Sequence, residues 1–342
     1  MGADAMTDAL LSLDHLSVSF DGESGRREVL RDVSFAIAPG EILGVVGESG
    51  SGKSVTALAI MRLLGAQGII TQGTIHLADT GELTRLSPDA MRAVRGRRIS
   101  MIFQEPMASL NPLMSVGRQV AEALEAHLGM SARAARAEVI AWFTRVGIPN
   151  PELRFDEYPH ALSGGMRQRV MIAMAMACQP ALLIADEPTT ALDVTIQAQI
   201  LALMKQLRHE HAAAILLITH DMGVIARMAD RVVVMYAGEV VEIGTLRTLF
   251  KAPAHPYTRL LLAAMPSVSR RSLRLPVIPG LMPSPGAMPT GCRFHPRCPD
   301  AIARCRVSAP PMVLVSADRM ARCWLAEGVQ ASPMPHPVGA LS

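Results

Sequence analysis

Gly47-Glu48-Ser49-Gly50-Ser51-Gly52-Lys53-Ser54 is the stretch of sequence that decides the fold. It fits the pattern G-x-x-x-x-G-K-[ST], in which glycines let backbone N–H groups surround a polyphosphate. The apolar run 41–46 before it predicts a buried parallel strand, and residues 55–64 after it predict a helix. Lys53 would then reach the β- and γ-phosphates, and the Ser54 hydroxyl would hold Mg²⁺. The stretch therefore predicts a nucleoside triphosphate site above a helix N-terminus.

The composition is typical of a globular chain without a membrane-spanning segment. Of the 342 residues, 50% are hydrophobic and 18% are charged, yet no apolar run reaches the roughly 20 residues that a spanning helix needs. Residues 1–8 lack the basic and apolar regions of a signal peptide. We expect the chain to stay in the cytosol and to meet a membrane only through partner proteins.

Positive charge is concentrated near the C-terminus. From Pro266 onward the chain has nine Arg, no Lys and three acids, a local charge of +6 against +3 for the whole chain. A solvated basic tail is one interpretation. A surface for acidic lipid headgroups or for an anionic cofactor is the other.

Hydrophobic patterning predicts a mostly parallel α/β sheet preceded by a hairpin. Residues 11–37 alternate apolar and polar around a Gly/Ser-rich turn at 21–25, which is typical of a β-hairpin. Five further strands alternate with helical stretches, as in a parallel sheet, and we place them at 42–46, 98–103, 181–185, 215–219 and 231–236.

Two changes of composition predict further parts of the molecule. Residues 106–178 are rich in Ala, Met and Arg and predict an inserted helical subdomain. Residues 276–289 hold five prolines and predict an extended linker. We expect a nucleotide-binding domain over 8–265 and a C-terminal extension over 266–342.

A second element that carries chemistry is the run 181–188, Ala-Leu-Leu-Ile-Ala-Asp-Glu-Pro. It delivers two acids to the C-terminal end of a buried strand, and burying both without a cation would be costly. We expect Asp186 to bind Mg²⁺ through its water shell and Glu187 to polarise the attacking water.

Three more polar sites follow predicted strands or turns. Gln104 comes just past a strand end, and His220 ends another strand. A Ser-Gly-Gly turn, Ser163-Gly164-Gly165, leads through Met166 into a helix and forms a second N-terminus suited to an anion.

In this order the motifs resemble those of the ATP-binding subunits of ABC transporters, over about residues 10–265. The matching motifs are the phosphate loop 47–54, Gln104, the signature 162–166, the acidic strand 181–188, Ala191-Leu192-Asp193 and His220. The resemblance implies an α/β fold: a P-loop NTPase core with an antiparallel β subdomain, an inserted helical subdomain and a Cys-containing C-terminal extension.

The resemblance also implies roles for residues. Two such domains would face each other head to tail, with each ATP between one phosphate loop and the partner's signature, Ser163, Gly164, Gly165 and Met166. His220 would hold the γ-phosphate and water, Gln104 would sense Mg²⁺, and Asp193 would bridge the two sites. Phe20 would stack on adenine, or it is a core residue of the hairpin.

Three stretches resemble the branch that imports dipeptides, oligopeptides or nickel: 103–112, 162–175 and 255–261. The family signature commonly ends in Gln, but Met stands at 166 in this chain, as in that branch. The branch implies a peripheral subunit on the cytoplasmic face of the inner membrane. Its partners would be a second ATPase in a heterodimer, two permeases and an extracytoplasmic solute-binding protein, with no nucleic acid. The rival interpretation is a soluble ATPase of this type acting on nucleic acid or ribosomes.

Four cysteines lie in the extension, Cys292, Cys298, Cys305 and Cys323. Their spacing matches neither paired C-x-x-C zinc sites nor ferredoxin runs, so it cannot name a metal. Residues 291–299 resemble the extension of oligopeptide- and dipeptide-importer ATPases, where four cysteines can hold a 4Fe–4S cluster. Such a cluster, zinc, or no metal at all remain open.

Overall fold

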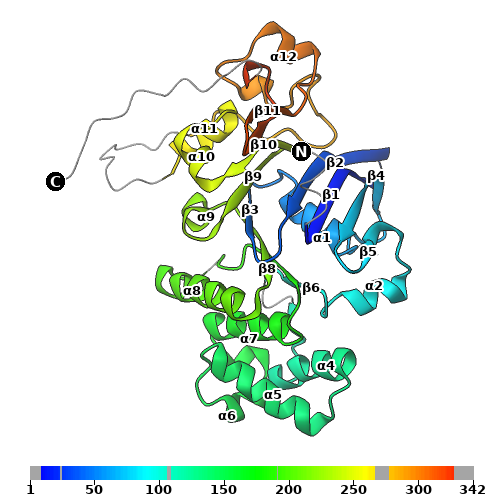
Figure 1. Ribbon diagram of the computed structural model, residues 1–342, viewed down its shortest axis with the longest axis vertical. Helices are drawn as coiled ribbons and strands as arrows, with labels where there is room; N and C mark the ends of the chain where they lie inside the picture. Colours follow the sequence, from blue (N-terminus) through cyan, green and yellow to red (C-terminus); the bar gives the residue numbers. More distant parts are fainter. Residues whose placement is uncertain (1–8, 24, 106–108, 191, 266–276, 327–342) are drawn as a thin grey trace, which may run out of the picture.

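The computed structural model describes residues 9–23, 25–105, 109–190, 192–265 and 277–326 (Figure 1). Ala191, the first residues of the predicted helical subdomain (106–108) and parts of the predicted extension (266–276 and 327–342) therefore lie outside the described residues. Within them, no helix is long and apolar enough to cross a membrane.

An eight-stranded sheet forms the centre of the molecule, in the order β11-β12-β10-β9-β3-β8-β7-β6. Its middle is parallel and almost fully buried, as the apolar runs predict. The parallel strands are β3 (Ile42–Val46), β6 (Ile99–Ile102), β7 (Leu182–Asp186), β8 (Ala214–Thr219) and β9 (Arg231–Tyr236).

A tight turn reverses the chain after β9. Ala237 and Gly238 both have positive φ, 47° and 82°, as a two-residue hairpin turn requires. A Cβ atom on Gly238 would lie 1.9 Å from the Val29 carbonyl oxygen, so only glycine fits there. β10 (Glu239–Thr245) therefore runs antiparallel to β9.

A second, antiparallel sheet has the order β2-β1-β4-β5 and packs beside α1 (Figure 1). The hairpin of β1 (Leu11–Gly22) and β2 (Gly25–Ile37) agrees with the alternation in the sequence. Its apolar face joins residues of the central sheet in one core, so this subdomain is continuous with the nucleotide-binding core. The remaining strands are β4 (Gly68–Leu77) and β5 (Gly81–Glu82).

Helices at the lower end of Figure 1 form the inserted subdomain. Trp142 and Phe143 are fully buried there, and a Cβ atom on Gly117 would lie 2.3 Å from the Phe155 ring, so the helices approach closely. The subdomain consists of α4 (Val116–Leu128), α5 (Ala132–Arg145), α6 (Pro151–Phe155) and α7 (Gly164–Met176). The other helices are α1 (Lys53–Ile60), α2 (Pro88–Val94), α8 (Val194–His211), α9 (Met222–Met228), α10 (Leu246–Lys251), α11 (Pro256–Ala263) and α12 (Ala303–Val307).

The C-terminal extension adds strands to the central sheet. The weak hydrophobic periodicity of the extension does not predict these strands. β11 (Val313–Ser316) pairs with β12 (Arg319–Ala321), and β12 pairs antiparallel with β10. Two short strands of the extension thus continue the sheet beyond the ATPase core.

Three arginines of the extension form ion pairs with acids of the preceding domain. Arg293 contacts Glu28 and Glu239, Arg297 contacts Glu48, and Arg322 contacts Asp32. For these three arginines, neither a solvated tail nor a lipid surface is the right interpretation of the positive charge. Their charge is matched within the chain.

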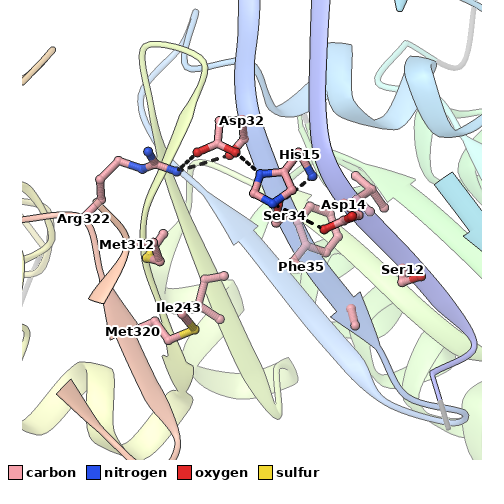
Figure 2. A pocket seen from close by; sticks show the side chains of 12 residues that line it. Ser12, Asp14, His15, Asp32, Ser34, Phe35, Ile243, Met312, Met320 and Arg322 are labelled. Atoms are coloured by element: carbon pink, nitrogen blue, oxygen red, sulfur yellow. Dashed lines mark hydrogen bonds and ion pairs between the residues drawn. The ribbon is translucent and has the colours of Figure 1, made fainter. Parts of the chain in front are cut away.

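A pocket of about 240 Å³ lies where the extension meets the hairpin of β1 and β2 (Figure 2). Phe35, Ile243 and methionines of the extension give it an apolar lining. Within its lining the Arg322 guanidinium donates to the Asp32 carboxylate at 2.8 Å, and the other oxygen of that carboxylate contacts His15 Nδ1 at 2.5 Å. The hydrogen bond to Asp32 raises the pKa of His15. Arg322 is thereby tied to the hairpin through paired charges.

Candidate nucleotide site

The phosphate loop connects β3 to α1 and is held tightly against the central sheet. Gly50 and Gly52 have φ of 80° and 103°, conformations that favour glycine. A Cβ atom on Gly47 would lie 2.2 Å from the Met235 carbonyl oxygen. Glycine at these positions lets the loop turn with its backbone exposed to a ligand at the start of α1.

Lys53 lies across this loop. Its side chain is 5% exposed, and Nζ donates to the carbonyl oxygens of Gly47 at 2.8 Å and Glu48 at 3.0 Å. Burial lowers the pKa of Lys53, while the carboxylates of Glu187 and Asp186 oppose that shift. A cation held here by the loop's own carbonyl groups is suited to bind phosphate oxygens.

Asp186 ends β7 beside the loop and is suited to a divalent cation. It is 5% exposed, and its Oδ1 has no hydrogen-bond partner among the residues that the structure describes. Burial raises the pKa of Asp186, although a hydrogen bond with Ser54 opposes the shift. An unpaired buried carboxylate oxygen is unfavourable, and Mg²⁺ coordination would satisfy it. Asp186 and Ser54 therefore fit a magnesium site.

Gln104, Glu187 and His220, the three residues expected to be catalytic, are in direct contact. Glu187 Oε2 accepts from Gln104 Nε2 at 3.1 Å, and Oε1 contacts His220 Nδ1 at 3.0 Å. Burial raises the pKa of Glu187, but hydrogen bonds from His220 and Thr190 outweigh it and hold the pKa below its usual value. Glu187 is thus kept ionised at neutral pH, ready to accept a hydrogen bond from water.

Thr190 is a site residue that the sequence analysis did not identify. Its hydroxyl donates to Glu187 Oε2 at 2.8 Å, three residues along the chain. The only signal for it was its position directly after the acidic strand. It fixes the carboxylate orientation together with Gln104.

The signature turn lies apart from the phosphate loop within one chain. Ser163 accepts from the Met166 backbone N–H at 3.3 Å and caps α7, which Figure 1 shows between α8 and the other helices of the helical subdomain. A Cβ atom on Gly165 would lie 3.0 Å from Ile196 of α8, so the turn packs against that helix. No hydrogen bond in the described part of the chain joins this turn to residues 47–54. A role on a second subunit's nucleotide remains a prediction.

Asp193 and Phe20 have structural partners. Asp193 Oδ1 accepts from the Ile196 backbone N–H at 2.9 Å and caps α8. Phe20 packs over Gly68, where a Cβ atom would lie 2.9 Å from the ring, and it also lines an open pocket of about 380 Å³. The packing of Phe20 against Gly68 supports its interpretation as a core residue of the hairpin. Stacking of Phe20 on adenine stays a prediction.

The four cysteines of the extension are all unpaired thiols. The Cys292 backbone N–H donates to the Cys305 carbonyl at 2.8 Å, and burial, with Cys305 and Cys323 adding to it, raises the pKa of Cys292 to about 12. Among the described residues, no group of three or more His, Cys, Asp or Glu could hold a metal ion. Burial also raises the pKa of the Cys298 and Cys323 thiols, whereas metal ligation requires thiolates. The structure gives the predicted 4Fe–4S cluster no support.

Comparison with known proteins agrees with this geometry. Residues 30–190 match the ABC transporter family, and residues 241–305 match the oligopeptide/dipeptide transporter C-terminal region. The chain is 47% identical over 315 residues to the dipeptide transport ATP-binding protein DppD of Escherichia coli, covering 92% of this chain and 96% of DppD. It is 49% identical over 325 residues to a probable peptide ABC transporter ATP-binding protein of Sinorhizobium fredii, with 95% and 97% covered.

Solved structures show the same fold. A dimeric, post-hydrolysis structure of the ATP-binding cassette MJ0796 bound to ADP and Pi superimposes with a TM-score of 0.63 at 28% identity, covering 69% of this chain and 99% of that one. The structure of cbiO1 from Clostridium perfringens gives a TM-score of 0.61 at 26% identity, with 72% and 92% covered.

Proposed function

The chain belongs to the family of ABC transporter ATP-binding subunits, and on that premise we propose that it is the ATP-hydrolysing subunit of a peptide importer. The observation that carries the proposal is the contact of Gln104, Glu187 and His220 beside the phosphate loop. Peptide cargo is supported by the names of the relatives and by the match of the extension. Nickel or another small solute is the alternative cargo.

The proposed reaction is in-line attack of water on the γ-phosphorus of ATP. Lys53 and the loop amides would bind the phosphates, while Ser54 and Asp186 would hold Mg²⁺, which offsets the phosphate charge. Glu187 would orient the attacking water and accept its hydrogen bond, with His220 and Gln104 fixing the carboxylate.

The proposed assembly is a head-to-tail pair of ATPase subunits beneath two permeases, peripheral to the cytoplasmic face of the membrane. The MJ0796 cassette bound to ADP and Pi is itself dimeric, which supports such a pair. In it, Ser163, Gly164, Gly165, Met166 and Asp193 would complete the partner's site. The second subunit would be a different ATPase, and a solute-binding protein would deliver the peptide.

Two experiments test the proposal together. Tagged protein is recovered in mild detergent from its own cells, and its partners are identified by mass spectrometry; two multi-span permeases and a second ATPase are expected. In parallel, Glu187→Gln should lower ATP turnover by roughly 10²–10⁴-fold while ATP still binds. Recovery with ribosomal or DNA-repair proteins instead would mean that the motor drives a different process. Wild-type turnover in the variant would remove Glu187 from its role.

We retain the 4Fe–4S cluster only as an implication of the resemblance, because the described thiols are not arranged around a metal. Anaerobic purification with iron and sulfide analysis decides the matter. Four irons per chain in a brown protein would support the cluster. A colourless, iron-free protein would withdraw it.

A further inference from the structure

Glu48, the second residue of the phosphate loop, is tied to the C-terminal extension. Arg297 Nη1 donates to Glu48 Oε2 at 2.7 Å and Nη2 to Oε1 at 2.9 Å, a two-point ion pair that fixes direction as well as distance. The Arg297 side chain is 5% exposed and that of Glu48 is 32% exposed. The contact joins positions 249 residues apart in the sequence.

The backbone of Glu48 is held as firmly as its side chain. Its N–H donates to the Tyr257 hydroxyl at 2.9 Å, and its carbonyl oxygen accepts from Lys53 Nζ at 3.0 Å. Tyr257 is fully buried against Tyr236 and Phe294, whose ring centroids lie 4.8 and 5.3 Å from its own. One residue of the loop therefore links the extension, α11 and the phosphate-binding lysine.

Arg297 itself has little freedom to move. Its Nε donates to the Pro279 carbonyl at 2.8 Å, and its guanidinium lies 5.7 Å from the centroid of the Tyr236 ring. The hydrogen bonds to Glu48 also raise the pKa of Arg297 above its ordinary value. The guanidinium is thus a fixed charged anchor and not a flexible surface group.

We propose that Arg297 is a positioning residue for ATP binding: through Glu48 the extension holds the phosphate loop in its nucleotide-binding shape. A loop that is already shaped loses less freedom when ATP binds, so the anchor lowers the ATP dissociation constant. Because the Glu48 carbonyl oxygen accepts a hydrogen bond from Lys53 Nζ, loss of the Arg297 contact would also displace the lysine that binds the phosphates. This inference rests on the proposed ATP site.

The test compares Arg297→Gln with Arg322→Gln as a matched control. Both remove an extension arginine from an ion pair, but Arg322 pairs with Asp32 on β2, and among the described residues neither has a hydrogen bond or ion pair with the phosphate loop. We expect Arg297→Gln to raise the dissociation constant and KM for ATP about tenfold with kcat within about twofold, since ground-state binding is lost. Arg297→Lys should lie between wild type and Arg297→Gln, because it keeps the charge without the two-point geometry. Arg322→Gln should bind ATP as wild type does.

Coupling with Glu48 supplies the second measurement. Glu48→Gln should weaken ATP binding to a similar extent, and the double variant should be no weaker than either single variant. Unchanged ATP binding in folded Arg297→Gln, or equal losses in Arg297→Gln and Arg322→Gln, would overturn the inference. Lys53→Ala distinguishes a failure of the role of Arg297 from a failure of the ATP site itself. If Lys53→Ala abolishes binding and Arg297→Gln does not weaken it, only the role of Arg297 fails; if neither changes binding, the ATP site itself fails.

Discussion

The buried histidine at the start of α11 makes the stability of this protein depend on pH. His255 is 2% exposed, and its Nδ1 accepts the Tyr257 backbone N–H at 3.0 Å, so this nitrogen must be unprotonated in the folded state. Burial lowers the pKa of His255 from 6.5 to about 3. Because the folded-state pKa is the lower one, the unfolded chain takes up a proton first as pH falls. The contribution of the neutral His255 to the free energy of unfolding is therefore fully present above about pH 6.5. It is lost progressively as the pH falls from there to about 3.

The size of the effect follows from the two pKa values. At pH 5 the histidine is almost fully protonated in the unfolded chain and unprotonated in the folded one. This difference lowers the free energy of unfolding by about 2 kcal/mol relative to pH 7. For a chain of this length that corresponds to a decrease in Tm of about 3 °C.

The assay is urea unfolding at pH 7 and pH 5 of wild type and His255→Asn. Asparagine also offers a capping oxygen but does not titrate. Comparing the two proteins at each pH therefore removes the pH effects that they share. The difference in the free energy of unfolding between the two proteins should shift by about 2 kcal/mol between the two pH values, in favour of the variant at pH 5. A difference that is the same at both pH values would refute the assignment of a neutral, buried His255.

Three further outcomes are expected. Lys53→Ala should raise the dissociation constant for a fluorescent ATP analogue at least about tenfold without lowering Tm, since the lysine supplies charge to the phosphates and not core packing; an unchanged constant would contradict its role. Gly238→Ala should destabilise the fold by more than about 1 kcal/mol in thermal melts, because its Cβ would lie 1.9 Å from a carbonyl oxygen. Gly25→Ala is its control, with similar φ but nothing within 4 Å, and the two should not melt alike. Trp142→Ala should cost about 3–5 kcal/mol in urea unfolding, as its fully buried ring fills the helical subdomain; a loss below about 1 kcal/mol would show that this core is loose.

Local sequence signals predict the parts of this fold that are built from neighbours along the chain. The glycines of the phosphate loop, the apolar run before Asp186 and the hairpin pattern each lie in one continuous stretch of sequence, and the strands expected there are present. Gln104, Glu187 and His220 each follow a strand, which the sequence does show, but their mutual contacts were not predicted. In a parallel sheet, residues that follow strands meet at one edge.

Contacts that span the chain left no such signal. Arg293, Arg297 and Arg322 pair with acids 265, 249 and 290 positions away, and a count of charges cannot say which acid each will find. Strand β12 has only three residues, too few to show an alternating pattern. The partners of Arg297 and Tyr257 were therefore visible only in three dimensions, although both residues lie in stretches noted for their resemblance to peptide importers.

The pairing of β12 with β10 has a consequence for any attempt to shorten the protein. Residues 242–244 of β10 meet residues 319–321 of β12, and in a chain cut after residue 265 these positions would lie at an open sheet edge. Unpaired backbone groups of this kind recruit strands from other molecules. We expect such a truncation to create a self-associating surface at the edge that the extension covers in the full chain.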